Sequence, residues 1–131
     1  MGKYGKVADF AMKELSADPT LSPVDAWKKA VTSVFPESES SQEKGCPRGA
    51  FLGLCEAGLV KGVPAGDYTR SDANKTYALR AASILKVKPE LVNNEDALWA
   101  EVMAGNEKTP NHQMDVVVSL WRSGAIKVER L

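Results

Sequence analysis

The sequence has no long hydrophobic run and no excess of charge of either sign. None of its apolar stretches reaches the roughly 18 to 20 residues that a membrane-spanning helix needs, and its first ten residues lack the apolar centre of a signal peptide. Because 17 Lys and Arg residues balance 17 Asp and Glu residues, attraction of the whole chain to nucleic acid or anionic lipid is not expected. We therefore expect a cytoplasmic protein without a membrane partner, and nucleic acid is disfavoured as a ligand.

Residues suited to metal or covalent chemistry are also scarce. The two cysteines, Cys46 and Cys55, and the single histidine, His112, do not form a metal-ligand spacing. The chain also lacks a Gly-rich phosphate loop followed by Lys-Ser or Lys-Thr, and it lacks a G-x-S-x-G nucleophile motif. No metal or cofactor is predicted, and whether the chain is an enzyme stays open.

The composition that is present is typical of a globular domain. The 131 residues are 44% hydrophobic and 26% charged, as in ordinary soluble proteins. The length fits one domain, because most domains hold about 100 to 150 residues. We expect residues 1–131 to form a single helical domain around one core.

Capping residues and the helical spacing of apolar residues predict six helices. Ser22, Ser71 and Asn94 are the expected N-caps of the second, fourth and fifth helices. The Ser-rich, acidic tract at residues 36 to 44 is expected to form a loop or a short helical turn. The predicted helices occupy residues 3 to 16, 23 to 35, 47 to 57, 72 to 87, 95 to 104 and 109 to 124.

The predicted fold class is therefore mainly α, a compact single-domain bundle of five to seven helices. A weak repeat adds a candidate β element, because LCEAGLVKGV and LWRSGAIKVE both run from a helix end through a glycine into β-prone residues. Segments 59–62 and 125–128 can pair as a tiny two-stranded ribbon on the helices. The side chains expected to fill the core are Trp27, Phe51, Leu54, Tyr77, Leu98 and Trp121.

Cys46 is the strongest chemical signal in the chain. If the third helix starts at Pro47, Cys46 is its N-cap, where the helix dipole and Arg48 favour a thiolate. This pattern predicts a thiol-dependent enzyme or redox-sensitive protein, with His112 or Tyr68 as the candidate acid or base. The alternative is a buried structural cysteine, as we expect for Cys55. The two cysteines are too far apart along one helix to form a disulfide, at roughly 13 Å.

A basic segment in the middle of the chain supports a second function. Residues 44 to 88 carry eight basic and three acidic side chains, so the flanks are acidic. Polar side chains gather near two helix starts in this segment, and helix N-termini attract anions. The leading hypothesis is a binding or regulatory module that holds a small anion or an acidic partner. Its candidate ligand-binding residues are Arg48, Tyr68, Arg70, Ser71, Asn74 and Lys75.

Two alternatives stay open for these patterns. Helix caps and solvated charges explain the polar residues individually. The helix, glycine and strand pattern is also compatible with a winged-helix-like DNA-binding protein, although very many helices end at a glycine.

The segment CPRGAFLGLCEAGLVKGVPAGDYTRSDANKTYA, with DAWKKA upstream, resembles a family of small uncharacterised bacterial proteins. That family is built around CPRxAFLGLCExGLVKG followed by YTxSxxNKxYA. The resemblance implies that Cys46, Arg48, Tyr68, Asn74 and Lys75, together with Ser71, belong to the characteristic segment of the family. It implies no activity, ligand or partner.

Overall fold

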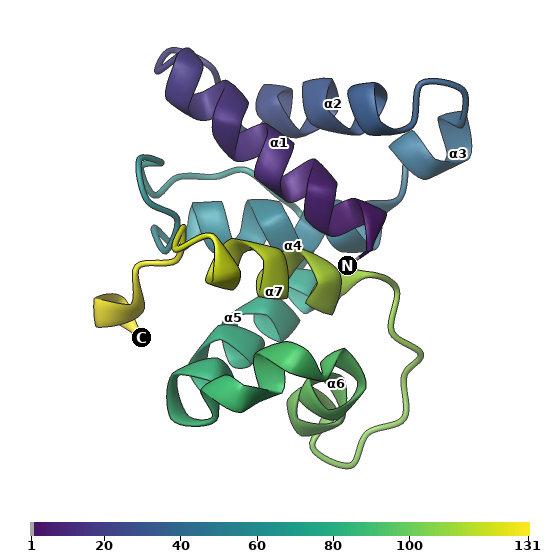
Figure 1. The fold of residues 1–131 in the computed structure, drawn as a ribbon, viewed down its shortest axis with the longest axis vertical. Helices are drawn as coiled ribbons and strands as arrows, with labels where there is room; N and C mark the ends of the chain where they lie inside the picture. The colour runs from purple at the N-terminus through teal and green to yellow at the C-terminus, as the bar shows by residue number, and fades with distance from the viewer. Residues whose placement is uncertain (1) are drawn as a thin grey trace.

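A computed structural model describes residues 2–131. Within these residues the chain forms seven α-helices, one of them a single turn, and two 3₁₀ helices (Figure 1). The mainly helical fold class predicted from the sequence is confirmed. The elements are α1 (Lys3–Ala17), α2 (Pro23–Val34), α3 (Glu39–Gln42), α4 (Gly45–Glu56), α5 (Asp72–Val87), η1 (Pro89–Asn93), α6 (Glu95–Met103), α7 (Gln113–Arg122) and η2 (Val128–Arg130).

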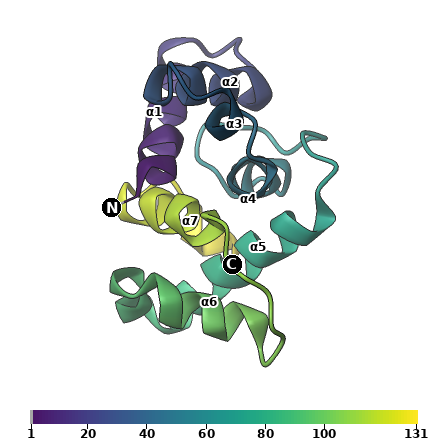
Figure 2. The same ribbon diagram turned by 90° about the vertical axis from the view of Figure 1, so that its right-hand side faces the viewer.

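The helices stack in tiers. In Figures 1 and 2, α1 and α2 lie side by side at the top, α4 and α7 cross the middle, and α5 and α6 lie at the bottom. The most extensive packing joins α4 to α5, α1 to α2 and α1 to α7. The central pair α4 and α7 therefore connects the upper helices to the lower ones.

The predicted N-caps are confirmed. The side chains of Ser22, Ser71 and Asn94 each accept a hydrogen bond from the backbone N–H three residues ahead. These bonds satisfy one of the free N–H groups at the start of each helix. The acidic tract after α2 contains the short helical turn α3.

Two helix starts differ from the prediction. Helix α4 begins at Gly45 rather than at Pro47, because the first four N–H groups of a helix need no intrahelical acceptor and proline fits within that first turn. Its N-cap is therefore Lys44 and not Cys46. Helix α7 begins at Gln113, since the indole N–H of Trp99 donates to the carbonyl of Lys108 and holds the preceding segment as a loop.

A capping group that the sequence did not reveal fixes the start of α1. The buried carboxylate of Asp115, on α7, accepts hydrogen bonds from the backbone N–H groups of Gly2 and Gly5 at 3.1 and 3.0 Å. A methyl group on Gly2 would collide with a carboxylate oxygen of Asp115. Glycine is therefore required for the carboxylate to approach the α1 backbone so closely.

Four of the six side chains predicted to fill the core are buried in it. Trp27, Phe51, Leu54 and Leu98 are fully buried, and the rings of Trp27 and Phe51 stack with centroids 5.2 Å apart. Tyr77 and Trp121 are only partly buried against this cluster. Trp99 is the side chain buried beneath Tyr77, whose ring meets its indole edge-on at 5.3 Å.

The predicted β element is confirmed in its smallest form. Val60 and Ile126 form an isolated antiparallel bridge, in which Lys61 N donates to Ala125 O at 2.8 Å and Lys127 N donates to Leu59 O at 2.7 Å. Both strand segments leave their helices through a glycine with a positive φ of 75°. Among the described residues, no helix has the length and apolar character needed to cross a membrane.

Candidate functional site

Residues near the starts of α4, α5 and α7 meet at one place in the molecule. A methyl group on Gly49 of α4 would lie 2.9 Å from Cβ of Asn74 and 3.2 Å from Cβ of Ser71, at the start of α5. Gln113, the first residue of α7, donates from its side-chain amide to Oδ1 of Asn74 at 3.2 Å. We call this meeting point of Gly49, Ser71, Asn74 and Gln113 the helix-start junction.

Hydrogen bonds within the junction occupy most of its polar groups. The Ser71 hydroxyl accepts from both the backbone N–H and the side-chain amide of Asn74, at 3.4 and 2.8 Å. The buried Gln113 side chain accepts from the backbone N–H of Asn111 at 2.6 Å. Two of the predicted ligand-binding residues, Ser71 and Asn74, are thus brought together and join the three helices.

Arg48 and Arg70 flank the junction in sequence, next to Gly49 and Ser71. Both are exposed, and neither forms a hydrogen bond or ion pair with any residue from 2 to 131. A Cβ on Gly45, the first residue of α4, would lie 3.6 Å from Nη2 of Arg48. The Arg48 guanidinium therefore lies over the positive end of the α4 dipole, where an isolated cation is disfavoured and an anion is favoured.

Lys75, in contrast, is already paired. Its Nζ lies 2.7 Å from Oε2 of Glu56, at the last turn of α4, and the Glu56 side chain is only 12% exposed. The other carboxylate oxygen accepts the backbone N–H groups of Tyr68 and Thr69 at 2.8 and 3.2 Å. The hydrogen bond from Lys75 and then these two backbone bonds lower the pKa of Glu56 to about 2.

Glu56 was missed in the sequence because its partners lie 12 to 19 residues away and share no local pattern with it. Its carboxylate ties the 62–68 loop and α5 to the end of α4. Lys75 and Tyr68 therefore contribute first to this structural anchor.

The two cysteines lie near opposite ends of α4 and differ in burial. Cys46 is the second residue of α4 and is half-buried, whereas Cys55 is buried and burial raises the pKa of its thiol. The Tyr68 backbone is bound to Glu56, which lies ten residues and about 15 Å along the helix axis from Cys46. The Tyr68 hydroxyl donates to the carbonyl of Pro64 at 2.7 Å. Tyr68 is thus held at the opposite end of α4 from Cys46.

His112 is the N-cap of α7 and has a positive φ of 66°, which is uncommon outside glycine. Its exposed ring lies 4.8 Å from the ring of Tyr4, whose hydroxyl donates to the carbonyl of Ser41. His112 therefore lies just outside the helix, whereas the predicted helix over residues 109 to 124 would have included it. Within residues 2–131 no group of three His, Cys, Asp or Glu side chains is placed to hold a metal ion.

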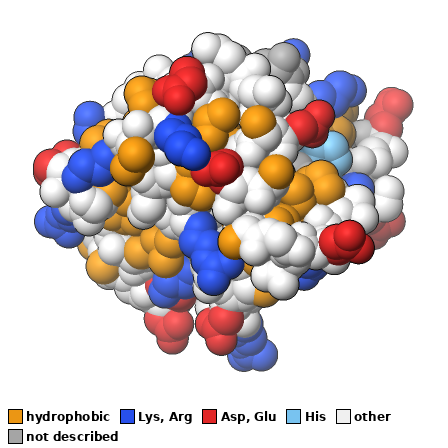
Figure 3. Space-filling view, turned by 90° about the horizontal axis from the view of Figure 1, so that it is seen from below, with side chains coloured by type: hydrophobic (Ala, Val, Ile, Leu, Met, Phe, Trp, Pro, Cys, Tyr) orange, Lys and Arg blue, Asp and Glu red, His pale blue; other side chains and the backbone are white. Residues whose placement is uncertain are grey.

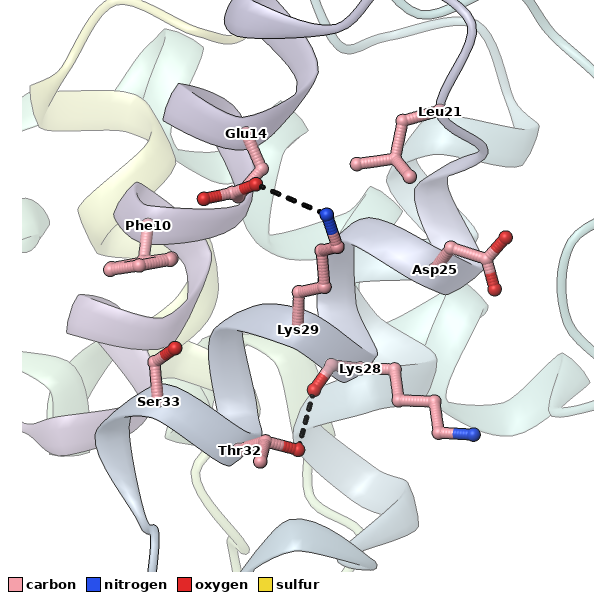
Figure 4. A pocket seen from close by; sticks show the side chains of 8 residues that line it. All are labelled: Phe10, Glu14, Leu21, Asp25, Lys28, Lys29, Thr32 and Ser33. Atoms are coloured by element: carbon pink, nitrogen blue, oxygen red, sulfur yellow. Dashed lines mark hydrogen bonds and ion pairs between the residues drawn. The ribbon is translucent and has the colours of Figure 1, made fainter.

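A groove between α1 and α2 was not predicted. Figure 4 shows Phe10 and Leu21 on opposite sides of this groove and Lys29 reaching toward Glu14. The groove has a volume of about 660 Å³, and Nζ of Lys29 lies 3.9 Å from a carboxylate oxygen of Glu14. Lys28 points away from that pair. The groove combines a small apolar surface with a charged rim.

The lower end of the molecule presents a mixed surface. Figure 3 shows basic, acidic and hydrophobic side chains interspersed over the end formed by α5 and α6. Lys88, the residue that follows α5, pairs with Glu101 of α6, and their side chains lie 2.7 Å apart. The basic charge at the end of the 44–88 segment is therefore partly neutralised, whereas Arg48 and Arg70 have no ion-pair partner within residues 2–131.

Comparison with known proteins identifies a family for the chain but assigns no activity to it. No curated protein matches the chain, and no solved structure matches it. A family of unknown function, DUF6979, matches residues 1–127, nearly the whole length. The chain therefore belongs to the DUF6979 family of unknown function.

Proposed function

We propose that the protein is a binding module that holds an anionic group between Arg48 and Arg70, beside the helix-start junction. The observation that carries this proposal is the contact of the α5 start with Gly49, the fifth residue of α4. An exposed arginine lies next to Gly49 and another next to Ser71, and neither has a hydrogen-bond or ion-pair partner among the described residues. An anion there would gain from both helix dipoles and from two guanidinium groups, which bind carboxylates and phosphates in bidentate geometry.

We assign this function to fewer residues than the sequence suggested. Lys75 is neutralised by Glu56, and the polar groups of Ser71 and Asn74 bond to each other. We assign the charge to Arg48 and Arg70, and we assign the positioning of the two helix starts to Ser71 and Asn74. The bound group belongs either to a small anion or to an acidic protein segment.

The packing of the buried apolar side chains into one cluster supports a single domain for residues 1–131. The cytoplasmic location, the bacterial origin and the family signature stay predictions.

Thermal unfolding with and without anions tests the proposal. We expect phosphate, citrate or ATP at ten times its dissociation constant to stabilise the fold by about 1.4 kcal/mol, which raises the melting temperature by roughly 4 to 6 °C for a domain of this size. Polyglutamate serves as the probe for an acidic partner. Stabilisation by polyglutamate alone would assign the site to a protein partner.

A matched pair of variants locates the effect. The double variant Arg48→Gln/Arg70→Gln should lose the stabilisation, whereas Lys6→Gln/Lys28→Gln removes the same charge from two exposed positions of α1 and α2 and should keep it. An equal loss in both variants would mean that only net charge matters. No stabilisation by any of these anions would refute the proposal.

A further inference from the structure

A second hollow separates the α1–α2 turn from the 62–68 loop. Its volume is about 440 Å³, within the range of roughly 300 to 1,000 Å³ typical of small-molecule sites. Leu15 and Leu21 contribute apolar surface from one side, and Val63 and the ring of Tyr68 contribute it from the other. The hollow is more enclosed than the α1–α2 groove.

The lining of this hollow contains no charged side chain among the described residues, although 26% of the chain is charged. The neighbouring α1–α2 groove differs, because Glu14, Asp25, Lys28 and Lys29 all line it. A charged ligand entering the hollow would lose hydration without gaining an opposite charge. The lining therefore selects an uncharged ligand.

Hydrogen bonds hold both walls of the hollow in place. On one side, Asp18 accepts from the backbone N–H and hydroxyl of Thr20 at 3.0 and 2.6 Å. On the other side, Glu56 holds the backbone of Tyr68, and the Tyr68 hydroxyl closes the loop onto Pro64. A preformed site of this kind loses little conformational entropy on binding.

The hydroxyl groups in the lining define the polar part of the ligand. The Ser22 hydroxyl accepts from Asp25 N, so its own proton is free to be donated. The hydroxyls of Thr20 and Tyr68 donate within the protein and keep lone pairs that can accept. A ligand hydroxyl can serve both kinds of partner, because it donates and accepts.

We propose that this hollow binds an uncharged, ring-containing alcohol or phenol. The ring would pack on the apolar walls, and the hydroxyl would reach Ser22, Thr20 or Tyr68. The site is distinct from the one proposed for anions, because neither Arg48 nor Arg70 lines it. Failure of one proposal therefore leaves the other intact.

Titration followed by two-dimensional ¹H–¹⁵N NMR tests this site with benzyl alcohol as the probe. We expect saturable shifts of the backbone amide signals of Thr20, Leu21, Gly62 and Val63. Benzoate and benzylammonium have the same ring with a charge, and we expect them to bind at least tenfold more weakly. Equal binding of the charged probes, or no saturable shift of these amides, would overturn the proposal.

A cavity-filling variant gives an independent test. Ser16 is exposed and lines the hollow, so Ser16→Trp should occupy the space and abolish the benzyl alcohol shifts. Ser40→Trp places the same side chain at an exposed position of α3 and should leave them unchanged. Retained binding in Ser16→Trp would contradict the proposal. If that variant does not fold, the comparison of neutral and charged probes still decides the question.

Discussion

The two ends of α4 use basic side chains in opposite ways. At its last turn, Glu56 forms an ion pair with Lys75 at 2.7 Å and also accepts hydrogen bonds from two backbone N–H groups. The charge of Lys75 is therefore neutralised within the protein. At its first turn, Arg48 is exposed and unpaired among the described residues, and Arg70 has the same status beside the start of α5. Lys75 and Arg70 are only five residues apart. The contrast shows that the basic residues of one segment can differ in role. A basic side chain that pairs with an acidic residue of the protein stabilises the fold, and one without such a partner can bind a ligand.

The largest effect is expected from the contact that brings α5 onto α4. A methyl group on Gly53 would lie 2.6 Å from Cα of Lys75, which is a backbone atom and cannot move aside alone. We expect Gly53→Ala to lower the free energy of unfolding by about 2 to 3 kcal/mol or more, because the helices must separate. Denaturant unfolding measures this loss.

Gly45→Ala is the matched control for this substitution. Its added methyl group would meet only the end of the flexible Arg48 side chain, at 3.6 Å. Alanine is the better helix former, so this variant should be as stable as the parent or slightly more stable. Similar losses in both variants would show that close α4–α5 packing is not the cause.

The Glu56 anchor should give the next largest effect, and it should depend on pH. The folded protein holds the pKa of Glu56 at about 2, below its ordinary value of 4.5, so the ionised carboxylate stabilises the fold. This stabilisation is complete above about pH 4.5 and is lost as the pH falls toward about 2. Glu56→Gln should therefore have a lower melting temperature at pH 7.

The difference between the parent and Glu56→Gln should shrink as the pH falls toward about 2, where about half of the parent carboxyl groups are protonated. Melting curves between pH 2 and pH 7 measure this convergence. Glu101→Gln is the control, because its pair with Lys88 has both side chains more than 40% exposed, at 43% and 49%, and exposed pairs contribute little. A constant difference at every pH would mean that Glu56 acts through packing and not through its charge.

The sequence predicts contacts between residues that are near each other in the chain, but not contacts between distant residues. The caps Ser22, Ser71 and Asn94 could be predicted because each bonds three residues ahead and leaves a local pattern. Glu56 and Asp115 could not, because they bind backbone groups 12 to 113 residues away in sequence. The close α4–α5 contact does leave a signal in the sequence, because Gly49 and Gly53 lie four residues apart on one face of a predicted helix, a spacing that indicates close approach of a neighbour.

The unpaired arginines should give a smaller effect on stability. Arg48→Gln/Arg70→Gln removes no hydrogen bond or ion pair among the described residues, so the free energy of unfolding should change by no more than about 0.5 kcal/mol per site. A small gain is reasonable at Arg48, where the cation lies over the positive end of α4. Lys75→Gln leaves Glu56 without its ion-pair partner and should lower stability more than either arginine substitution. A larger loss in the arginine variant would show that these side chains are structural after all.

The smallest effect concerns the two cysteines, which occupy the same two ends of α4 and should differ in reactivity without any change in stability. Cys46 is half-buried in the first turn, so an alkylating reagent should modify it in the native protein. Cys55 is buried, and burial raises the pKa of its thiol, so the reactive thiolate forms only when the protein opens. Mass spectrometry after alkylation at several pH values would give the two rates separately, and the Cys55 rate should follow unfolding by denaturant.

Modification of Cys46 would keep a thiol-dependent function open but would not establish it, because Tyr68 is held at the far end of the helix and catalysis still needs an acid or base within reach. If Cys46 also stays unmodified until the protein unfolds, both cysteines are structural and the thiol-enzyme hypothesis fails.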